Sequence, residues 1–314
     1  MANSTVDVML DGLESDEESS PFETSVIIPN SVLNALLIPI CIAGNILVLA
    51  AVWRNPSLNT PSTIFLCSLA VSDLFVGFLL LPVRIAIARF ILSGSSSYSR
   101  LFQARIFLTI QLCCVSLETM TAISVDRYLA LRYHMRYPDM MTSRRATCVA
   151  ATFWWINVIL SLLSIWKKNA ILLVVVLFAA LCLFISSITY NAIYRIVRHH
   201  QNQIHAQQQA VQSMNAEQNL KIQAKKRAAN TFIYYICMLL CYIPGAVSAL
   251  ITVAYEQHWN IMIGWYFETI MFMNSAINPF LYIWRNREIQ RAVLKILRKI
   301  LCKTDEENLN NGDQ

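Results

Sequence analysis

Residues 121–138 read TAISVDRYLALRYHMRYP, a stretch that begins as apolar sequence, reaches the adjacent pair Asp126 and Arg127, and then turns basic. The apolar run that ends here starts near residue 101, so it is long enough to cross a membrane as a helix, for which about 20 residues suffice. Ionisable side chains inside such a helix are costly and rare. The acid–base pair therefore indicates a functional feature at one end of a membrane span.

The whole chain has the same character as this run. It has 314 residues, of which 56% are hydrophobic and only 14% are charged, and this is too apolar for an ordinary soluble domain. We therefore predict an all-α membrane protein, a seven-transmembrane helix bundle with spans at residues 25–53, 62–85, 101–131, 145–166, 170–197, 228–255 and 261–285.

The charges are placed asymmetrically along the chain. No Lys or Arg precedes Arg54, whereas the segments after the third, fifth and seventh spans are rich in both. Under the positive-inside rule this predicts a multi-pass plasma-membrane protein with an extracellular N-terminus. Residues 1–24 lack the apolar core of a cleaved signal peptide, so we expect the first span to act as its own insertion signal. Asn3 begins an Asn-Ser-Thr glycosylation acceptor on the expected outer side.

The predicted organisation is an acidic extracellular tail at 1–24, the bundle at 25–285, an amphipathic membrane-surface helix at 286–302 and a cytosolic tail at 303–314. The surface helix is predicted because apolar residues recur at helical spacing between basic ones: Ile289, Val293, Ile296, Leu297 and Ile300. A basic helix of the kind that calmodulin binds is the alternative. Cys302, at the end of this helix, is a candidate for palmitoylation.

Several polar residues fall at one depth near the middle of the predicted spans. Asp73 has no basic residue within a helical turn, and around its level lie Asn45, Ser116, Asn274, Ser275 and Asn278. A carboxylate among amides and hydroxyls can hold a sodium ion or a proton, or the groups can simply join helices by hydrogen bonds. The second interpretation explains Asn45 well, and the first better explains a buried acid without a counter-charge.

Two prolines lie inside the last two spans. Proline removes a backbone hydrogen bond and kinks a helix, so Pro244 in the sixth span is a candidate hinge. Pro279 in the seventh span is followed by Tyr282 toward the cytosolic end.

Together, these motifs resemble those of rhodopsin-like (class A) G-protein-coupled receptors across residues 25–302. The matching pieces are Gly44-Asn45, LAVSD ending at Asp73, Asp126-Arg127-Tyr128, Pro244 and NPFLY at residues 278–282. The resemblance implies an extracellular ligand and a heterotrimeric G protein as partners, with arrestin and a receptor kinase as further candidates. It also implies a sodium site formed by Asp73, Ser116, Asn274, Ser275 and Asn278.

The resemblance gives the opening acid–base pair a role. Asp126 would hold Arg127 at rest, and activation would free Arg127 to meet the G protein and the tyrosines Tyr282 and Tyr190, with Tyr194 one turn away. The alternative is that Arg127 only extends to the interface, which would not require an adjacent acid.

Some positions depart from the pattern of that family. Phe102 stands where a cysteine is usual, so we expect no extracellular disulfide, and Tyr242 replaces the usual tryptophan two residues before Pro244. The short second outer loop and the absence of a proline from the fifth span loosely resemble the melanocortin, cannabinoid and adenosine receptor group. Asn278-Pro279 departs from the Asp-Pro typical of melanocortin receptors.

The outer halves of the spans would form the ligand pocket, where the candidate residues are Arg84, Arg105, Thr109, Cys113, Tyr242 and Glu268. Thr109 stands where amine receptors carry an aspartate, which argues against an amine bound in the usual way. Glu268 is predicted to pair with Arg84 or Arg105, or the arginines receive an anionic head group while Glu268 contacts the ligand.

Other functions remain as alternatives. An ion-coupled transporter would use Asp73 on a conduction path, but the sequence contains no internal repeat to support it. A receptor-like protein without G-protein signalling is conceivable because of Tyr242 and the missing proline. We expect no enzymatic activity and no cofactor beyond a possible allosteric sodium ion. The basic segments suit membrane lipid and a transducer better than nucleic acid.

Overall fold

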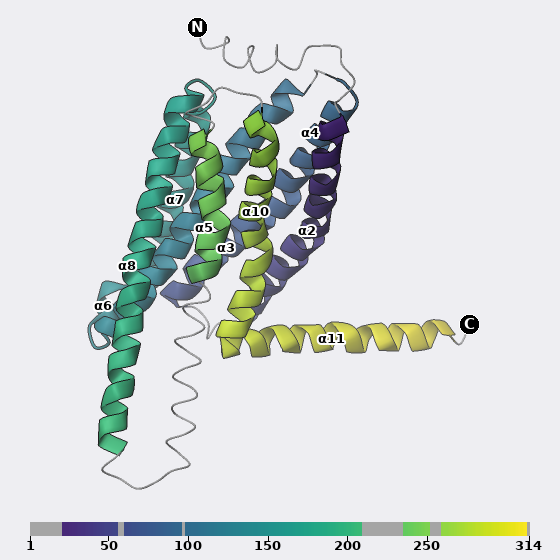
Figure 1. Ribbon diagram of the computed structural model, residues 1–314. Coiled ribbons are helices and arrows are strands. Elements are labelled where there is room, and N and C mark those ends of the chain that lie inside the picture. The colour runs from purple at the N-terminus through teal and green to yellow at the C-terminus, as the bar shows by residue number, and fades with distance from the viewer. Residues whose placement is uncertain (1–20, 56–59, 96–97, 209–234, 252–258, 313–314) are drawn as a thin grey trace.

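The computed structural model describes residues 21–55, 60–95, 98–208, 235–251 and 259–312, which form helices and short connections with no strand among them (Figure 1). In chain order the elements are α2 (Pro21–Trp53), α3 (Pro61–Phe75), a π-helical turn η2 (Val76–Leu80), α4 (Leu81–Leu92), α5 (Ser99–Arg132), α6 (Tyr137–Met140), α7 (Ser143–Leu163), α8 (Lys168–Gln208), a helix at Tyr235–Ile251, α10 (Trp259–Arg285) and α11 (Arg287–Gly312). Asn3, with the rest of the tail before residue 21, lies outside the described residues.

The predicted seven-helix membrane bundle is confirmed. Five described helical segments are long and apolar enough to cross a membrane: Thr24–Trp53, Pro61–Leu92, Ser99–Arg132, Ser143–Leu163 and Asn169–His199. The helix Tyr235–Ile251 and α10 occupy the sixth and seventh predicted spans. Large apolar side chains such as Trp155, Leu177 and Phe184 are exposed while Asp73 and Asn278 are fully buried, as expected where lipid is the solvent.

The second span differs most from its predicted bounds. It continues past residue 85 to Leu92, and it is interrupted by η2, where the Leu81 N–H donates to the Val76 carbonyl five residues earlier. Pro82 follows directly and cannot donate the usual helical bond, so the wider π turn accommodates its ring. The fourth span ends at Leu163 rather than residue 166, because Ser164 turns back and its hydroxyl donates to the Ser161 carbonyl at 2.7 Å.

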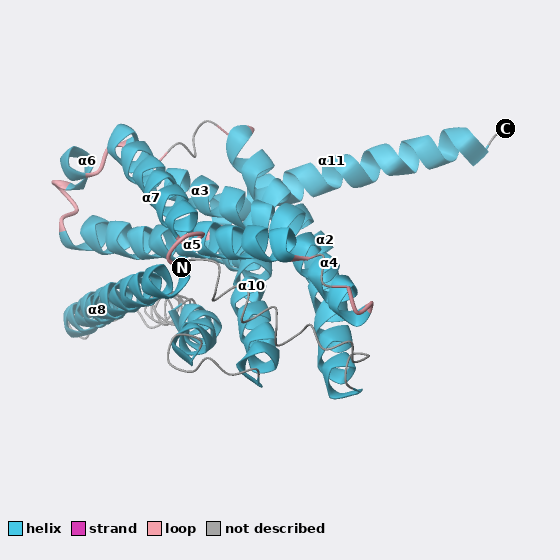
Figure 2. Cartoon of the chain, turned by 90° about the horizontal axis from the view of Figure 1, so that it is seen from above, coloured by secondary structure: helices cyan, strands magenta, loops and turns pink. Residues whose placement is uncertain are grey.

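Helix α5 lies in the middle of the bundle and packs against α3, α7 and α8, while α2 packs against α3, α4, α10 and α11 (Figures 1 and 2). One approach between α2 and α10 is especially close. A Cβ added at Gly44 would lie 2.9 Å from the Cγ of Pro279, so only glycine fits there. This contact holds α2 against α10 at the level of the buried polar residues.

The predicted amphipathic helix is present as α11, which turns away from the end of α10, points out of the bundle and continues past Cys302 to Gly312 (Figure 1). Its first turns do not lie free on a surface, because Ile289, Val293 and Ile296 are buried in the core of the bundle. The side chain of Cys302 is outside the described set. We refer below to the end of the bundle that carries α11 and α6 as the α11 end.

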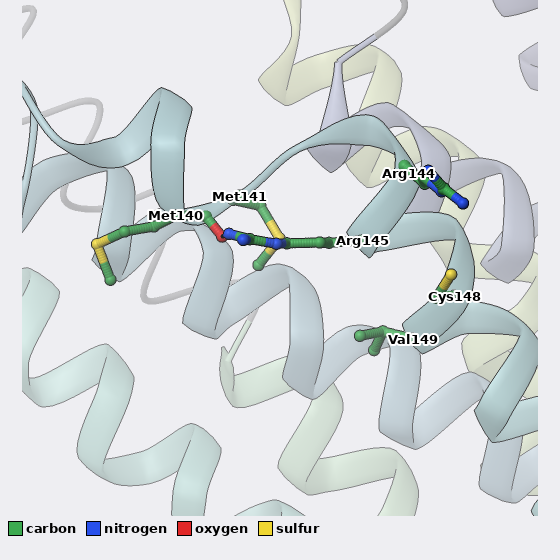
Figure 3. Close-up of a pocket in the computed structure, with 6 residues that line it drawn as sticks. All are labelled: Met140, Met141, Arg144, Arg145, Cys148 and Val149. Atoms are coloured by element: carbon green, nitrogen blue, oxygen red, sulfur yellow. Dashed lines mark hydrogen bonds between the residues drawn. The ribbon is translucent and has the colours of Figure 1, made fainter.

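The connection between α5 and α7 at the α11 end contains the short helix α6, which periodicity did not predict. Arg145 closes this connection, since its Nη1 donates to the carbonyls of Asp139 and Met140 at 2.7 and 2.8 Å. Beside it is an open groove of about 440 Å³, shown in Figure 3 and lined by Met140, Met141, Arg144, Arg145, Cys148 and Val149.

Candidate functional site

The buried polar residues form three clusters at three depths. The first, which we call the Asp73 cluster, lies at mid-bundle and consists of Asp73, Asn45, Ser116, Asn274, Ser275 and Asn278. The Asn278 amide donates to Asp73 at 2.8 Å, the Ser116 hydroxyl donates to it at 3.5 Å, and Ser275 adds a further hydrogen bond. Helices α3, α5 and α10 therefore meet at one carboxylate, which is fully buried.

The Asp73 cluster has the donor set that a sodium ion prefers. Besides the carboxylate, the amide oxygens of Asn45, Asn274 and Asn278 are buried with no hydrogen-bond partner among the described residues. Buried polar atoms are rarely left without a partner, so three such oxygens in the same cluster as a carboxylate are suited to binding a cation. The residues present thus fit the sodium ion that the sequence resemblance implied.

Tyr242 connects this cluster to the next turn of α5. Its hydroxyl donates to the Cys113 carbonyl at 3.5 Å and accepts from the Asn274 amide at 3.5 Å. The Asn274 amide also contacts the Met120 sulfur at 3.4 Å rather than Asp73. Tyr242 therefore occupies a position where the helix at Tyr235–Ile251, which contains Pro244, is joined to both α5 and α10.

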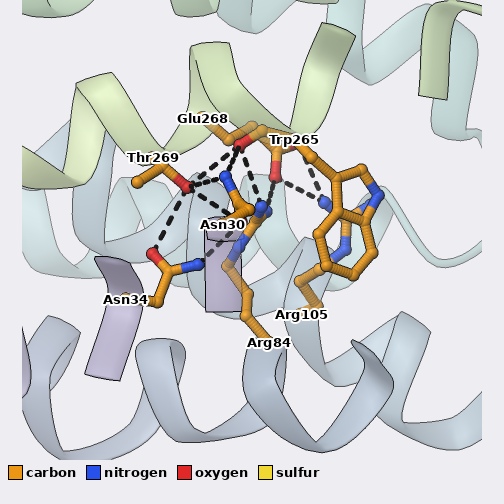
Figure 4. Close-up of polar contacts among 7 residues, drawn as sticks. All are labelled: Asn30, Asn34, Arg84, Arg105, Trp265, Glu268 and Thr269. Carbon is orange, nitrogen blue, oxygen red and sulfur yellow. Dashed lines mark hydrogen bonds and ion pairs between the residues drawn. The ribbon is translucent and has the colours of Figure 1, made fainter. Parts of the chain in front are cut away.

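The second cluster, the Glu268 cluster, lies toward the end of the bundle opposite the α11 end. It is drawn in Figure 4. Its centre is the Glu268 carboxylate on α10, which pairs with Arg84 from α4 and with Arg105 from α5. The sequence left open which arginine would pair, and the answer is both. Arg105 Nη1 contacts Oε1 and Oε2 of Glu268 at 2.8 and 2.6 Å.

The two arginines have different surroundings. The Arg84 side chain is 0% exposed, and its Nη2 donates to the Trp265 carbonyl at 3.1 Å. The guanidinium of Arg84 also lies over the rings of Trp265 and Phe272, at 4.8 and 5.2 Å from their centres. The Arg105 side chain is 15% exposed and lies over Phe102 at 4.7 Å.

Three polar residues that sequence reasoning missed support this cluster. Asn30 on α2 donates to Thr269 at 3.0 Å and to the Trp265 carbonyl at 3.3 Å, and Asn34 donates to Asn30 at 2.9 Å (Figure 4). Asn30 and Asn34 lie one helical turn apart in an apolar run, and this pattern could have identified them as interior polar residues. They fix α2 to α10 beside Glu268.

The third cluster, the Asp126 cluster, lies at the α11 end. The Asp126 carboxylate is fully buried and accepts hydrogen bonds from the Ser62 hydroxyl of α3 and, at 2.7 Å, from the Tyr137 hydroxyl of α6. Burial, and then the hydrogen bond to Asp126, raise the pKa of Tyr137 to about 12, so this hydroxyl stays protonated at neutral pH. Neither Ser62 nor Tyr137 was predicted.

The other residues of the predicted switch differ in exposure. The Arg127 side chain is exposed, whereas Tyr190 and Tyr282 are buried, at 6% and 1% exposure. Tyr190 stacks on Tyr235 with ring centres 5.2 Å apart, while Tyr194 is exposed, so Tyr190 is the tyrosine that faces the bundle. Tyr128 is half-buried and packs against the core.

A further ionisable pair, Glu118 on α5 and Asn157 on α7, was not singled out from the sequence. Both are buried, and the Asn157 amide donates to the two carboxylate oxygens of Glu118 at 2.9 Å each. An acid in the middle of an apolar run was the signal that should have identified it. The pair joins α5 to α7 away from the three clusters.

Replacing Asn157 by leucine should destabilise the protein by about 1–3 kcal/mol, because the buried Glu118 carboxyl loses its donor. The double variant Glu118→Leu with Asn157→Leu should regain much of this loss, since both polar partners are removed together. Thermal unfolding of the purified chain measures both. Asn191→Leu is the control, because Asn191 is exposed and its amide donates to the Ser187 carbonyl of its own helix. Equal stability of the single and double variants would disprove the coupling.

Apolar helices facing outward around buried charge define a multi-pass membrane protein with a polar interior. Residues 44–170 match the model of the family described as "7 transmembrane receptor (rhodopsin family)". The chain is 26% identical to Adenosine receptor A2b of Gallus gallus, over 88% of this chain and 90% of the relative, and 29% identical to Histamine H2 receptor of Canis lupus familiaris, over 88% and 81%.

The chain is therefore a rhodopsin-like (class A) G-protein-coupled receptor, which binds a ligand and signals through a G protein. The recognition made from short motifs is confirmed, and the adenosine receptor falls in the group that the sequence loosely resembled.

Proposed function

We propose that this receptor lies in the plasma membrane with its N-terminus and the Glu268 cluster outside, and that a sodium ion at the Asp73 cluster holds its resting packing. The positive-inside pattern of the sequence supports this orientation. The observation that carries the proposal is the buried Asp73 carboxylate, together with three buried amide oxygens of its cluster that have no partner among the described residues.

The sodium ion would be held by Asp73, Ser116 and Ser275 together with the amide oxygens of the same cluster. Bound there, it supplies the positive charge that the buried carboxylate otherwise lacks. In the protein, α3, α5 and α10 meet at the Asp73 carboxylate. An ion that binds this packing of the helices more tightly than other packings therefore stabilises this packing. Activation then requires the cluster to rearrange.

The ligand binds between the outer halves of the helices, at the partly exposed Arg105 and Glu268, with Thr109, Cys113 and Tyr242 deeper along the same path. The buried Arg84 supports this site from behind by pairing with Glu268. Tyr242 supports a coupling between the two clusters, because its hydroxyl contacts α5 and Asn274 at the same time. The relatives are named for adenosine and histamine, and Thr109 argues against an amine held by an aspartate at that position. Pro244 is the hinge on which the sixth span moves.

The G protein binds at the α11 end, where Arg127 is exposed, and Tyr190 and Tyr282 are the buried tyrosines that Arg127 would meet on activation. The groove of Figure 3 offers this partner apolar contacts from Met141 and Val149 next to arginine charge. Arrestin and a receptor kinase would use the same end. A palmitoyl chain on Cys302 and a glycan on Asn3 complete the arrangement, with the part of α11 beyond the bundle lying on the inner lipid surface.

Sodium is expected to stabilise the purified receptor and to lower its basal nucleotide exchange, relative to N-methylglucamine chloride at equal ionic strength. At ten times the Kd, the stabilisation should be about 1.4 kcal/mol. Asp73→Asn should remove both effects, because the amide keeps the shape but not the charge. Thermal unfolding and exchange on a G protein in lipid vesicles measure the two effects.

Asp139→Asn provides the matched control, since Asp139 is an exposed acid on α6. A sodium response that survives in Asp73→Asn, or that disappears equally in Asp139→Asn, would show that the ion acts elsewhere or that only general salt effects are present.

A further inference from the structure

We propose that the ligand of this receptor carries an acidic head group, a carboxylate or a phosphate, which binds the guanidinium of Arg105. This inference rests on the outward orientation and ligand site proposed above and names the ligand class. It starts from the charges of the Glu268 cluster, where two arginines surround one carboxylate. The cluster therefore carries one positive charge in excess.

The excess charge does not belong to Arg84. That guanidinium is fully buried, pairs with Glu268, donates to the Trp265 carbonyl and lies between two aromatic rings. A ligand could reach it only by taking the helices apart. The Arg84–Glu268 pair is a structural ion pair between α4 and α10.

Of the two arginines in the cluster, Arg105 is the one that a ligand can reach. Only its Nη1 is bonded, to both oxygens of Glu268, and its Nη2 and Nε have no hydrogen-bond partner in the part of the chain that the structure describes. The buried side-chain atoms that lack a hydrogen-bond partner do not include Nη2 or Nε of Arg105. These two nitrogen atoms are therefore accessible to a ligand. Stacking on Phe102 fixes the plane of the guanidinium, which leaves two parallel N–H donors ready for a carboxylate or phosphate.

A second polar group lies one helical turn deeper on the same face of α5. The Thr109 hydroxyl is buried and has no hydrogen-bond partner among the described residues. Residues four apart on a helix are neighbours, so a ligand whose acidic group binds Arg105 can extend a polar atom to Thr109. A hydroxyl without a partner among the described residues, beneath a partly exposed guanidinium, is the arrangement of a ligand site rather than of helix packing.

Most of the charged side chains that are described near the site are basic. Arg89, Arg100 and Lys167 are exposed there, and Glu268 is the acid that the described side chains place among them. Because Glu268 is already paired with two arginines, an amine would meet the guanidinium of Arg105 at the site.

The test is a thermal-unfolding titration of the purified full chain in neutral detergent at constant ionic strength. The probes are inorganic phosphate, dodecyl phosphate, dodecanoate and uncharged dodecanol. We expect the acidic probes to raise the unfolding midpoint in a saturable way and dodecanol not to. Stabilisation by inorganic phosphate alone would identify a free anion as sufficient, and stabilisation only by the amphiphiles would identify a lipid-like acid.

Arg105→Gln should shift the concentration for half-maximal stabilisation at least tenfold upward, as expected for the loss of a charge-assisted contact. Arg105→Lys keeps the charge without the fork and should give an intermediate shift. Arg100→Gln, an exposed arginine in the first turn of the same helix, is the control and should change little.

The proposal is overturned if no acidic probe stabilises the chain, if dodecanol does so equally, or if Arg105→Gln leaves the titration unchanged. Unfolding is measured without a G protein, so this failure is distinct from that of the proposed function. If the acidic probes bound saturably but no nucleotide exchange occurred, the proposed signalling mechanism would be refuted and the proposed anion site would stand.

Discussion

Replacing Arg127 by alanine is expected to reduce receptor-driven nucleotide exchange strongly while leaving surface expression and the unfolding midpoint largely unchanged. Arg127 is exposed at the α11 end, so its loss leaves no hole in the core. If its guanidinium meets the G protein with charge-assisted hydrogen bonds of about 1.5–3 kcal/mol, exchange should fall by roughly tenfold to 150-fold.

The measurement is exchange on several G-protein classes in lipid vesicles, without ligand and with the most strongly stabilising acidic probe. Arg132→Ala is the matched control, because Arg132 is an exposed arginine at the end of the same helix. Arg127→Lys should retain part of the activity, since it keeps the charge and loses the planar fork. Exchange by Arg127→Ala at the level of the unmodified receptor would mean that this residue does not carry the coupling.

Replacing Glu268 by leucine is expected to remove most folded receptor from the cell surface. The variant leaves Arg84 completely buried with no acid beside it, and breaking a buried ion pair in this way costs about 3–5 kcal/mol. Because typical domains are stable by only about 5–15 kcal/mol, such a loss is severe. Surface labelling and the unfolding midpoint of the purified protein report it.

The double variant Arg84→Met with Glu268→Leu tests the physical cause. It removes both charges from the buried pair, so expression and stability should recover substantially although Arg105 also loses its partner. Arg105→Gln alone should cost about 1 kcal/mol or less, because that side chain is partly exposed and its pair with Glu268 is screened. A Glu268→Leu protein as stable as the parent would show that Arg84 finds another partner.

The Asp73 cluster was largely predictable from sequence. Its residues recur at helical spacing in long apolar runs, where any acid or amide stands out, and matching depths along the helices placed them at one level. The structure places Asp73 beside Ser116, Ser275 and Asn278. Asn274 instead turns to Tyr242 and Met120, a choice that depends on rotation of α10 and not on spacing.

The Glu268 and Asp126 clusters were only partly predictable. The charged members of the Glu268 cluster were named, but Asn30, Thr269 and the sharing of one carboxylate by two arginines depend on how four helices, α2, α4, α5 and α10, meet. The partners Ser62 and Tyr137 of Asp126 come from other elements, and Tyr137 lies in a short loop helix with no periodic signal. Sequence adjacency suggested Arg127 as the partner of Asp126, and a restraint between these two stays a prediction.

The amino-acid sequence by itself determined that this chain is a seven-helix membrane receptor, because the length of each apolar run and the short motifs inside it are properties of the chain alone. The tertiary structure alone decided which buried polar groups form hydrogen bonds with one another, and that the Glu268 cluster carries an excess positive charge. Those outcomes depend on the rotation, tilt and π turn of helices packed side by side, and a single helix contains no information about the face that its neighbour presents.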